Sequence, residues 1–170
     1  MKKYLNKLIR VQRESGCGNY NTDGILLAEN KNFLLIANER EMQIDGYTVI
    51  NKKFVKRVYA SKSRDFVLKM MKKEGQLKKI KNKIKLGDTM WEIFKQIKKY
   101  YGAVIIENER KDIFILGTLK NIFDKGVEVN HIDAEGKYWK KSRMIEYEKI
   151  NLITWDCRYL NYYVKYGKTV

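Results

Sequence analysis

Two stretches of this chain, about 95 residues apart, share one pattern. Residues 46–66 and residues 142–160 each begin with a short extended apolar segment, pass through a charged turn and resume as a strand. In that strand the apolar residues recur three apart, and Val58 in the first stretch corresponds to Ile153 in the second. This repeat predicts that the chain contains the same structural unit twice. Each unit would hold roughly 75 to 85 residues, which is small for an independent core, so we expect the two units to pack on each other.

Three further correspondences fix the register of the two copies. They are Gly24 with Gly117, Val55 with Ile150, and Arg64 with Arg158, at separations of 93, 95 and 94 residues. Because these separations are nearly equal, only small changes in loop length distinguish the copies. The repeat therefore predicts a common fold for the two units, and a shared fold carries no information about chemistry.

The first copy has the pattern of a small β-barrel. Apolar runs between turn residues predict strands at 5–13, 24–28, 33–37, 47–50 and 55–60, and a helix at 63–73. A loop or wide hairpin is expected at 15–24, and turns are expected at 30–32 and 45–46. Five short, bent strands are typical of SH3 or Sm barrels, in which closure of the sheet removes exposed strand edges.

The second copy begins with a helix, because Thr89 and Glu92 form a capping-box pattern and apolar residues then recur at helical spacing to about residue 100. Strands are expected at 103–109, 112–121 and 127–132, before the repeated stretch and a closing helix. We therefore predict a mostly β, α+β fold, a tandem duplication of two five-stranded SH3/Sm-like barrels that are each followed by a helix. The predicted domains are 1–75 and 88–170, joined by a basic linker at 76–87.

The second copy also resembles a group of bacterial proteins of uncharacterised function with SH3/Sm-like barrel repeats. The resemblance covers residues 88–166 best. It rests on the strand pair VIIENERKDIFILGTL, an Ile-Asp-x-x-Gly-x-Trp turn, and a final Ile-x-x-Ile strand followed by Arg-Tyr. In this chain the turn, Ile132 to Trp139, is one residue longer before the tryptophan. The resemblance implies the barrel fold and transfers no activity.

The net charge of +16 is the compositional feature that bears on function. It favours a polyanionic partner, nucleic acid or an acidic protein, although a chain rich in lysine, asparagine and isoleucine acquires such a charge without any binding role. No apolar run approaches about 18 residues, and the first charges are too closely spaced for a signal peptide, so we expect a cytoplasmic protein with no membrane association. Cys17 and Cys157 are too few for a disulfide framework or a metal cluster, and we expect free thiols.

Half of the charge excess lies between Lys69 and Lys99, where eleven lysines accompany three acidic residues. Lysines along such a segment would neutralise phosphates, and nearby aromatic side chains would stack on unpaired bases. The competing interpretation is that the aromatic residues belong to the core and that the lysines keep a linker solvated. The candidate nucleic-acid-binding residues are Lys69, Lys72, Lys73, Lys78, Lys79, Lys81, Lys83, Lys85, Trp91, Tyr100 and Tyr101.

We therefore predict a non-catalytic protein that binds nucleic acid, RNA or single strands, through this segment. The alternative is a protein-interaction or regulatory adaptor that uses barrel edges and a C-terminal helix. In that helix the tyrosines recur at helical spacing, which core packing also explains. They are Tyr159, Tyr162, Tyr163 and Tyr166.

A metal-dependent nuclease is the third prediction, because Glu107, Glu109 and Lys111 end an expected strand in an order that such enzymes use. The pattern is short and common, and no upstream aspartate occupies a comparable strand end. The single histidine, His131, has no serine or cysteine that the sequence pairs with it. We expect no catalytic residue, no metal site and no cofactor.

Overall fold

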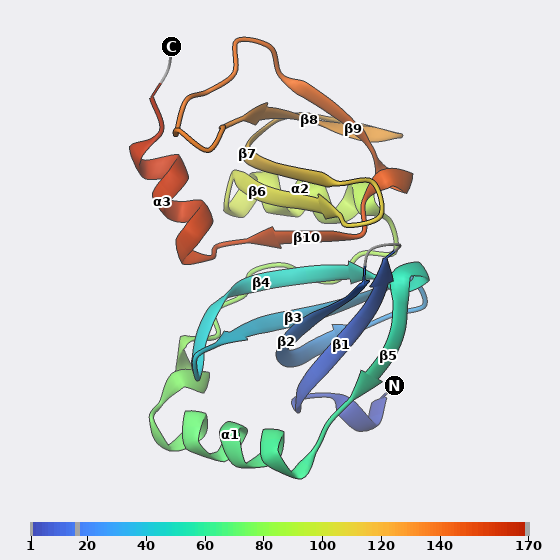
Figure 1. Ribbon diagram of the computed structural model, residues 1–170, viewed down its shortest axis with the longest axis vertical. Helices are drawn as coiled ribbons and strands as arrows, with labels where there is room; N and C mark the ends of the chain where they lie inside the picture. The colour runs from blue at the N-terminus through green and yellow to red at the C-terminus, as the bar shows by residue number, and fades with distance from the viewer. Residues whose placement is uncertain (1, 16–17, 169–170) are drawn as a thin grey trace.

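The computed structural model describes residues 2–15 and 18–168, which form one ten-stranded antiparallel sheet with three α-helices (Figure 1). The strands are β1 (Leu8–Ser15), β2 (Gly18–Glu29), β3 (Phe33–Arg40), β4 (Gln43–Asn51), β5 (Val55–Tyr59), β6 (Ala103–Asn108), β7 (Ile113–Phe123), β8 (Gly126–His131), β9 (Arg143–Glu146) and β10 (Leu152–Trp155). The helices are α1 (Lys62–Lys73), α2 (Met90–Tyr100) and α3 (Arg158–Tyr166). Short 3₁₀ turns are η1 (Lys2–Tyr4), η2 (Lys52–Phe54), η3 (Gln76–Lys79) and η4 (Tyr147–Lys149).

The order of the strands in the sheet shows the repeat that the sequence predicts. It runs β5-β1-β2-β3-β4 across the first half and continues β10-β6-β7-β8-β9 across the second, so both halves have the same internal order. In each half a 3₁₀ turn, η2 or η4, connects the fourth strand to the fifth. Val58 pairs with Val11, and Ile153 pairs with Ile106, which are equivalent positions of the two halves. The correspondence between Val58 and Ile153 is therefore confirmed by the pairing.

Gly24 and Gly117 are also equivalent in structure. A Cβ atom on Gly117 would collide with the carbonyl oxygen of Asn130 on the next strand, and one on Gly24 would collide with the carbonyl oxygen of Ala37. The missing side chain lets the neighbouring strand approach closely at both places. This packing requirement explains why the two copies share a glycine there.

The prediction of two separate barrels is wrong. Strand β4 pairs with β10 from the other half, and the sheet continues into the second half without closing. Two contacts favour β10 at this position. The hydroxyls of Thr48 and Thr154 are 2.8 Å apart and buried, and the rings of Tyr47 and Trp155 stack with centroids 5.9 Å apart. Ala60, which stands in the first half where Trp155 stands in the second, has no ring to stack.

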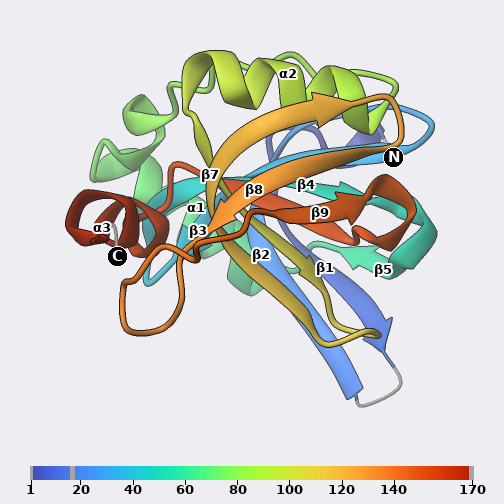
Figure 2. The same cartoon turned by 90° about the horizontal axis from the view of Figure 1, so that it is seen from above.

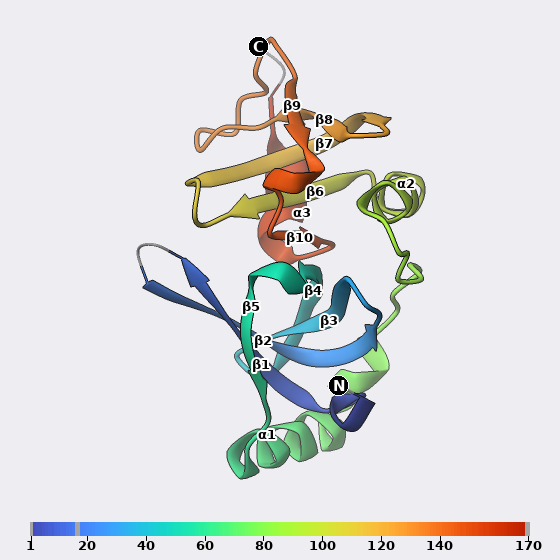
Figure 3. The ribbon, with the colours of Figure 1, turned by 90° about the vertical axis from the view of Figure 1, so that its right-hand side faces the viewer.

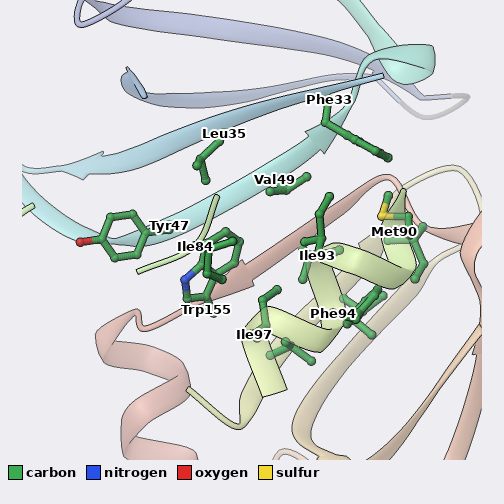
Figure 4. Close-up of a cluster of buried hydrophobic side chains, with 14 of the residues drawn as sticks. Phe33, Leu35, Tyr47, Val49, Ile84, Met90, Ile93, Phe94, Ile97 and Trp155 are labelled. Carbon is green, nitrogen blue, oxygen red and sulfur yellow. The ribbon is translucent and has the colours of Figure 1, made fainter. Parts of the chain in front are cut away.

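One hydrophobic core spans both halves (Figure 4). Phe33 and Val49 contribute from the first half, and Phe94 contributes from α2 in the second. Residues 76–87, expected to be a linker, lie against this core and bury Ile84. The two halves therefore share one apolar interior, with the basic segment packed along it.

The helices lie on different parts of the sheet (Figures 1 and 3). In the second half, α2 covers the face that contributes to the shared core, whereas α3 packs on the opposite face and buries Leu160 against Ile105 and Leu116. Helix α1 lies beside β1 at the other end of the molecule, with Met71 buried and Phe66 exposed. Only part of the apolar stripe of α1 is therefore covered.

Of the two alternatives for 15–24, a loop or a wide hairpin, the structure has the hairpin. Strand β2 begins at Gly18, and the β1–β2 hairpin projects as a long arm (Figure 2). Polar residues on that arm conceal the strand from a hydrophobicity pattern. The predicted turn at 45–46 is a bulge within β4, opposite Asn38, and Gly46 adopts a φ of 77° there. The chain reverses at Glu41 and Met42.

Candidate nucleic-acid interface

The basic segment between α1 and α2 begins with η3, which ends at Lys79, and the exposure of its side chains then alternates. Lys79, Lys81, Lys83 and Lys85 are exposed, while the residues between them are more covered and Ile84 is buried in the shared core. Successive side chains of an extended chain point to opposite sides, so burial of the apolar set directs the lysines outward. We call these four lysines the lysine row.

The backbone of the lysine row is held by side chains from both halves. The N–H groups of its last three lysines donate to the hydroxyl of Tyr47 at 2.7 Å, the hydroxyl of Tyr101 at 3.1 Å and Oε1 of Gln96 at 2.9 Å. Gln96 on α2 also donates to the carbonyl of Lys85 at 2.9 Å. Burial raises the pKa of Tyr47, so this hydroxyl stays neutral. The path of the segment is therefore fixed, while its side chains remain in solvent.

The start of α2 engages the carboxylate of Glu92. The Thr89 hydroxyl accepts a hydrogen bond from the N–H of Glu92, and the Glu92 carboxylate accepts from the N–H groups of Thr89 and Asp88. This is the capping box predicted from the sequence. The hydrogen bonds from Thr89 and Asp88 lower the pKa of Glu92. The carboxylate therefore caps the helix, and none of the lysine row pairs with it.

A groove of about 530 Å³ lies between α2 and β7. We call it the tryptophan groove, and its lining residues are Trp91, Lys95, Lys98, Lys99, Asn121, Ile122 and Phe123. The rings of Trp91 and Phe123 are 36% and 48% exposed. The Lys95 ammonium lies 3.9 Å from the centroid of the Trp91 ring, and Lys98 donates to the Lys120 carbonyl at 2.5 Å. The groove thus combines exposed aromatic faces with positive charge, as single-strand-binding surfaces do.

The structure brings some predicted residues together and separates others. All eight predicted lysines are exposed, as are Trp91 and Tyr100. Three of those lysines lie on α1, which is distant from α2 (Figure 3), so they belong to neither the lysine row nor the tryptophan groove. Tyr101 packs with its ring centroid 6.3 Å from that of Trp155, and its hydroxyl holds the lysine row, so Tyr101 is structural.

The sequence prediction missed Lys95, Lys98 and Lys99 as site residues, together with Phe123 from β7. A signal for the first of these was present, because Trp91, Lys95 and Lys98 recur at helical spacing and so lie on one flank of α2. Phe123 had no comparable signal, since its position depends on how β7 packs against the helix.

The residues of the nuclease prediction have different surroundings. Glu109 forms an ion pair with Arg13, N to O distance 2.8 Å, and accepts from Asn151 at 2.9 Å. Burial raises the pKa of Glu109, but the charge of Arg13 and these hydrogen bonds outweigh it, and the pKa is lowered. Glu107 lines a different place, a cleft of about 580 Å³ shared with Asp45. Burial and the charge of Glu109 raise the pKa of Glu107.

Lys111 is exposed. Within the described residues, no group of three or more His, Cys, Asp or Glu side chains is arranged to hold a metal ion. Cys157 is a buried free thiol whose pKa is raised by burial, and Cys17 lies outside the described residues. His131 is buried with Nδ1 3.1 Å from the Leu116 carbonyl oxygen, and burial lowers its pKa.

Helix α3 exposes most of its tyrosines. Tyr162 and Tyr166 are 60% and 65% exposed, and Tyr159 is also exposed, whereas Leu160 is the residue that α3 buries. Core packing therefore does not account for the tyrosine spacing. The tyrosines form an aromatic surface on the side of the sheet opposite α2.

No helix in the described part of the chain is long and apolar enough to cross a membrane. Comparisons of this chain with protein-family models, with curated proteins and with solved structures found no match.

Proposed function

We propose that this protein binds nucleic acid, RNA or DNA single strands, at a surface formed by the lysine row and the tryptophan groove. The observation that carries the proposal is the lysine row itself. Its four side chains are exposed, and side chains of the folded protein hold the backbone at Lys81, Lys83 and Lys85. On an extended backbone, lysines two residues apart, as these three are, lie about 6.6 Å from one another, twice the rise of an extended residue.

Electrostatics supplies the affinity in this proposal. Each lysine that neutralises a phosphate releases counterions, so binding weakens as salt increases. Fixing the backbone in advance also lowers the conformational entropy that the protein loses on binding. A solvated linker gains nothing from ordered lysines, and the hydrogen bonds that order this segment therefore favour a binding role.

The tryptophan groove favours single strands. Unpaired bases stack on aromatic side chains at about 1–3 kcal/mol for each base, whereas bases in a duplex are already stacked. Trp91 and Phe123 offer rings, and Lys95 and Lys98 lie beside them. We place this function in the cytoplasm, where RNA is the abundant partner.

The test is a binding titration with single- and double-stranded RNA and DNA at several salt concentrations. The variant replaces all four lysines of the lysine row with alanine. It should bind single strands more weakly, and its dependence of log K on log salt should be shallower by about 0.7 for each phosphate that the variant no longer neutralises. The control replaces four exposed lysines elsewhere, which changes the net charge equally. These are Lys31, Lys62, Lys140 and Lys141.

The control variant should keep the wild-type dependence of log K on log salt. Absence of binding at low salt would refute the proposal, and equal loss in both variants would show that net charge acts without a defined surface. We further propose that the bound strand is not cleaved. Degradation that requires Mg²⁺ or Mn²⁺, and that is lost in Glu109→Gln while circular dichroism shows that this variant is still folded, would move the nuclease prediction to first place.

A protein-interaction role is the second candidate, and the exposed tyrosines of α3 favour it. Tyrosine is enriched in protein interfaces because it tolerates both burial and water. Replacing Tyr162 and Tyr166 with serine should leave nucleic-acid affinity unchanged under our proposal. If nucleic acid fails to bind the wild type, this surface becomes the leading candidate for recognition of a protein partner.

A further inference from the structure

The junction between the two halves is a defined pairing of strands. The fourth strand of the first half, β4, pairs antiparallel with the fifth strand of the second half, β10. The cross-strand pairs are Tyr47 with Trp155, Thr48 with Thr154, Val49 with Ile153, and Ile50 with Leu152. The ladder extends by one more bond, from the N–H of Asn51 to the carbonyl of Asn151 at 2.9 Å.

The same two kinds of strand form the outer edges of the sheet. The second half ends in β9, which is its fourth strand, and the first half ends in β5, which is its fifth. Because both halves have the same strand order, β9 corresponds to β4 and β5 corresponds to β10. The two outer edges of the sheet, β9 and β5, are therefore equivalent to two strands that pair with each other inside the molecule.

We propose that copies of this chain assemble head to tail, with β9 of one copy pairing antiparallel with β5 of the next in the register of the internal junction. Such a contact joins two different surfaces, so it propagates from copy to copy and gives rings or filaments. The partner is a second copy because the internal junction already shows this pairing between the equivalent strands. Unpaired N–H and C=O groups on edge strands are templates for such addition.

The residues that this register places opposite one another are complementary at three of four positions. The four pairs are Glu146 with Lys56, Ile145 with Arg57, Met144 with Val58, and Arg143 with Tyr59. The first pair joins opposite charges, the third joins apolar side chains, and the fourth sets a cation beside an aromatic ring. The second pair joins an apolar and a charged residue, whereas the internal junction has two apolar residues at that position. The contact between copies is therefore weaker than the internal junction.

The exposure of Met144 on β9 supports the proposed contact between copies. Met144 is 55% exposed, whereas Val49, at the equivalent position of β4, is fully buried. A strand of a second copy along β9 would place Val58 beside Met144, as β10 places Ile153 beside Val49. Glu146 forms an exposed ion pair with Lys149 of its own chain, N to O distance 2.7 Å, which leaves its side chain 50% exposed at the same edge.

The experiment is sedimentation velocity on the full chain without nucleic acid, at protein concentrations up to about 1 mM. The average mass of the wild type should rise with concentration. Glu146→Lys and Lys56→Glu should each require about tenfold more protein for the same association, because like charges would then face each other. The double variant, which restores opposite charges in the reversed order, should recover the association of the wild type.

The control is Glu135→Lys, which makes the same charge change at an exposed residue away from β9 and should leave association unchanged. Far-ultraviolet circular dichroism confirms that each variant is folded. A wild type that is monomeric at every concentration overturns the proposal, and so does a double variant that associates no better than the single ones. Because nucleic acid is absent, neither result bears on the proposed function.

Discussion

The carboxylate of Asp45, in the β4 bulge, accepts a hydrogen bond 2.8 Å long from the backbone N–H of Arg158, the first residue of α3. Cys157, the N-cap residue, makes no capping hydrogen bond of its own. A residue from the first half therefore caps a helix of the second.

Asp45→Ala should lower the free energy of unfolding by about 1–2 kcal/mol, because it leaves an N–H at the start of α3 without its acceptor. Asp45→Asn keeps an accepting oxygen and should retain most of the stability. Urea denaturation measures both. Equal losses in the two variants would show that the cap is not the cause.

The ion pair of Arg13 and Glu109 also joins the halves, between the β1–β2 and β6–β7 hairpins, which project to the same side of the molecule (Figures 2 and 3). Both side chains are almost fully buried, with 5% and 8% exposure. Glu109→Gln should cost about 3–5 kcal/mol, since it leaves the guanidinium buried without its counter-charge.

This stabilisation should depend on pH. The pKa of Glu109 is lowered in the folded protein, so the contribution is fully present above the ordinary glutamate pKa and is lost as pH falls through the lowered value. Urea midpoints of wild type and Glu109→Gln should therefore converge in acid. A difference in urea midpoint that does not change with pH would show that the charge of Glu109 is not its cause.

Glu107→Gln should have the opposite effect and stabilise the protein at neutral pH. The pKa of Glu107 is raised by burial and by the charge of Glu109, so the folded protein loses stability as pH rises through that value. Glutamine removes the buried charge. The gain should shrink as pH falls below the raised pKa and should vanish below the ordinary glutamate pKa, and a destabilised Glu107→Gln protein at pH 7 would show that this carboxylate has a partner it needs.

Trp91→Ala should weaken binding of single strands by about 1–3 kcal/mol and affect duplexes less, because it removes one stacking face. Phe66→Ala is the matched control. It removes an exposed ring on α1, away from the tryptophan groove and the lysine row, so it should leave the affinity for single strands unchanged. Fluorescence anisotropy with labelled single-stranded and duplex nucleic acid measures the affinities of both variants. An unchanged affinity in Trp91→Ala would exclude the tryptophan groove from the binding surface.

Ile153→Asp should unfold the entire sheet in one transition, because Ile153 is fully buried in the core that both halves share. Val58→Asp should cost less, because the equivalent residue lies on the edge strand β5 and is partly exposed. Circular dichroism during thermal unfolding reports the number of transitions. Survival of one half after Ile153→Asp would show that the halves fold independently.

Local signals predicted local structure well. The capping box at Thr89, the hairpin around residues 30–32 and the shared glycines depend on interactions within a few residues or within one strand pair, and all are present. The partner of β4 was not predictable in this way. Strands β5 and β10 follow the same apolar pattern, and the choice between them depends on the contacts of Thr154 and Trp155 with residues far away in sequence.

The candidate site also combines local features that the sequence shows with distant contacts that it does not show. Alternation of lysine with apolar residues is visible in the sequence, but it predicts only a linker because no turn or strand partner accompanies it. What fixes the segment are hydroxyl and amide groups of Tyr47, Tyr101 and Gln96, which are distant in sequence. Likewise, nothing near Glu109 in the sequence indicates that Arg13 neutralises it.

The last of the ten strands in the sequence, β10, occupies a central place in the sheet, between β4 and β6. A ribosome adds about 5–20 residues per second, so β4, which ends at Asn51, is made several seconds before the strand that pairs with it. Until Leu152 to Trp155 are made, the growing polypeptide has two open interior edges, at β4 and β6, with Val49 and Ile106 uncovered. We expect a fragment that ends before Leu152 to expose both edges to other chains, and the completion of β10 to close them.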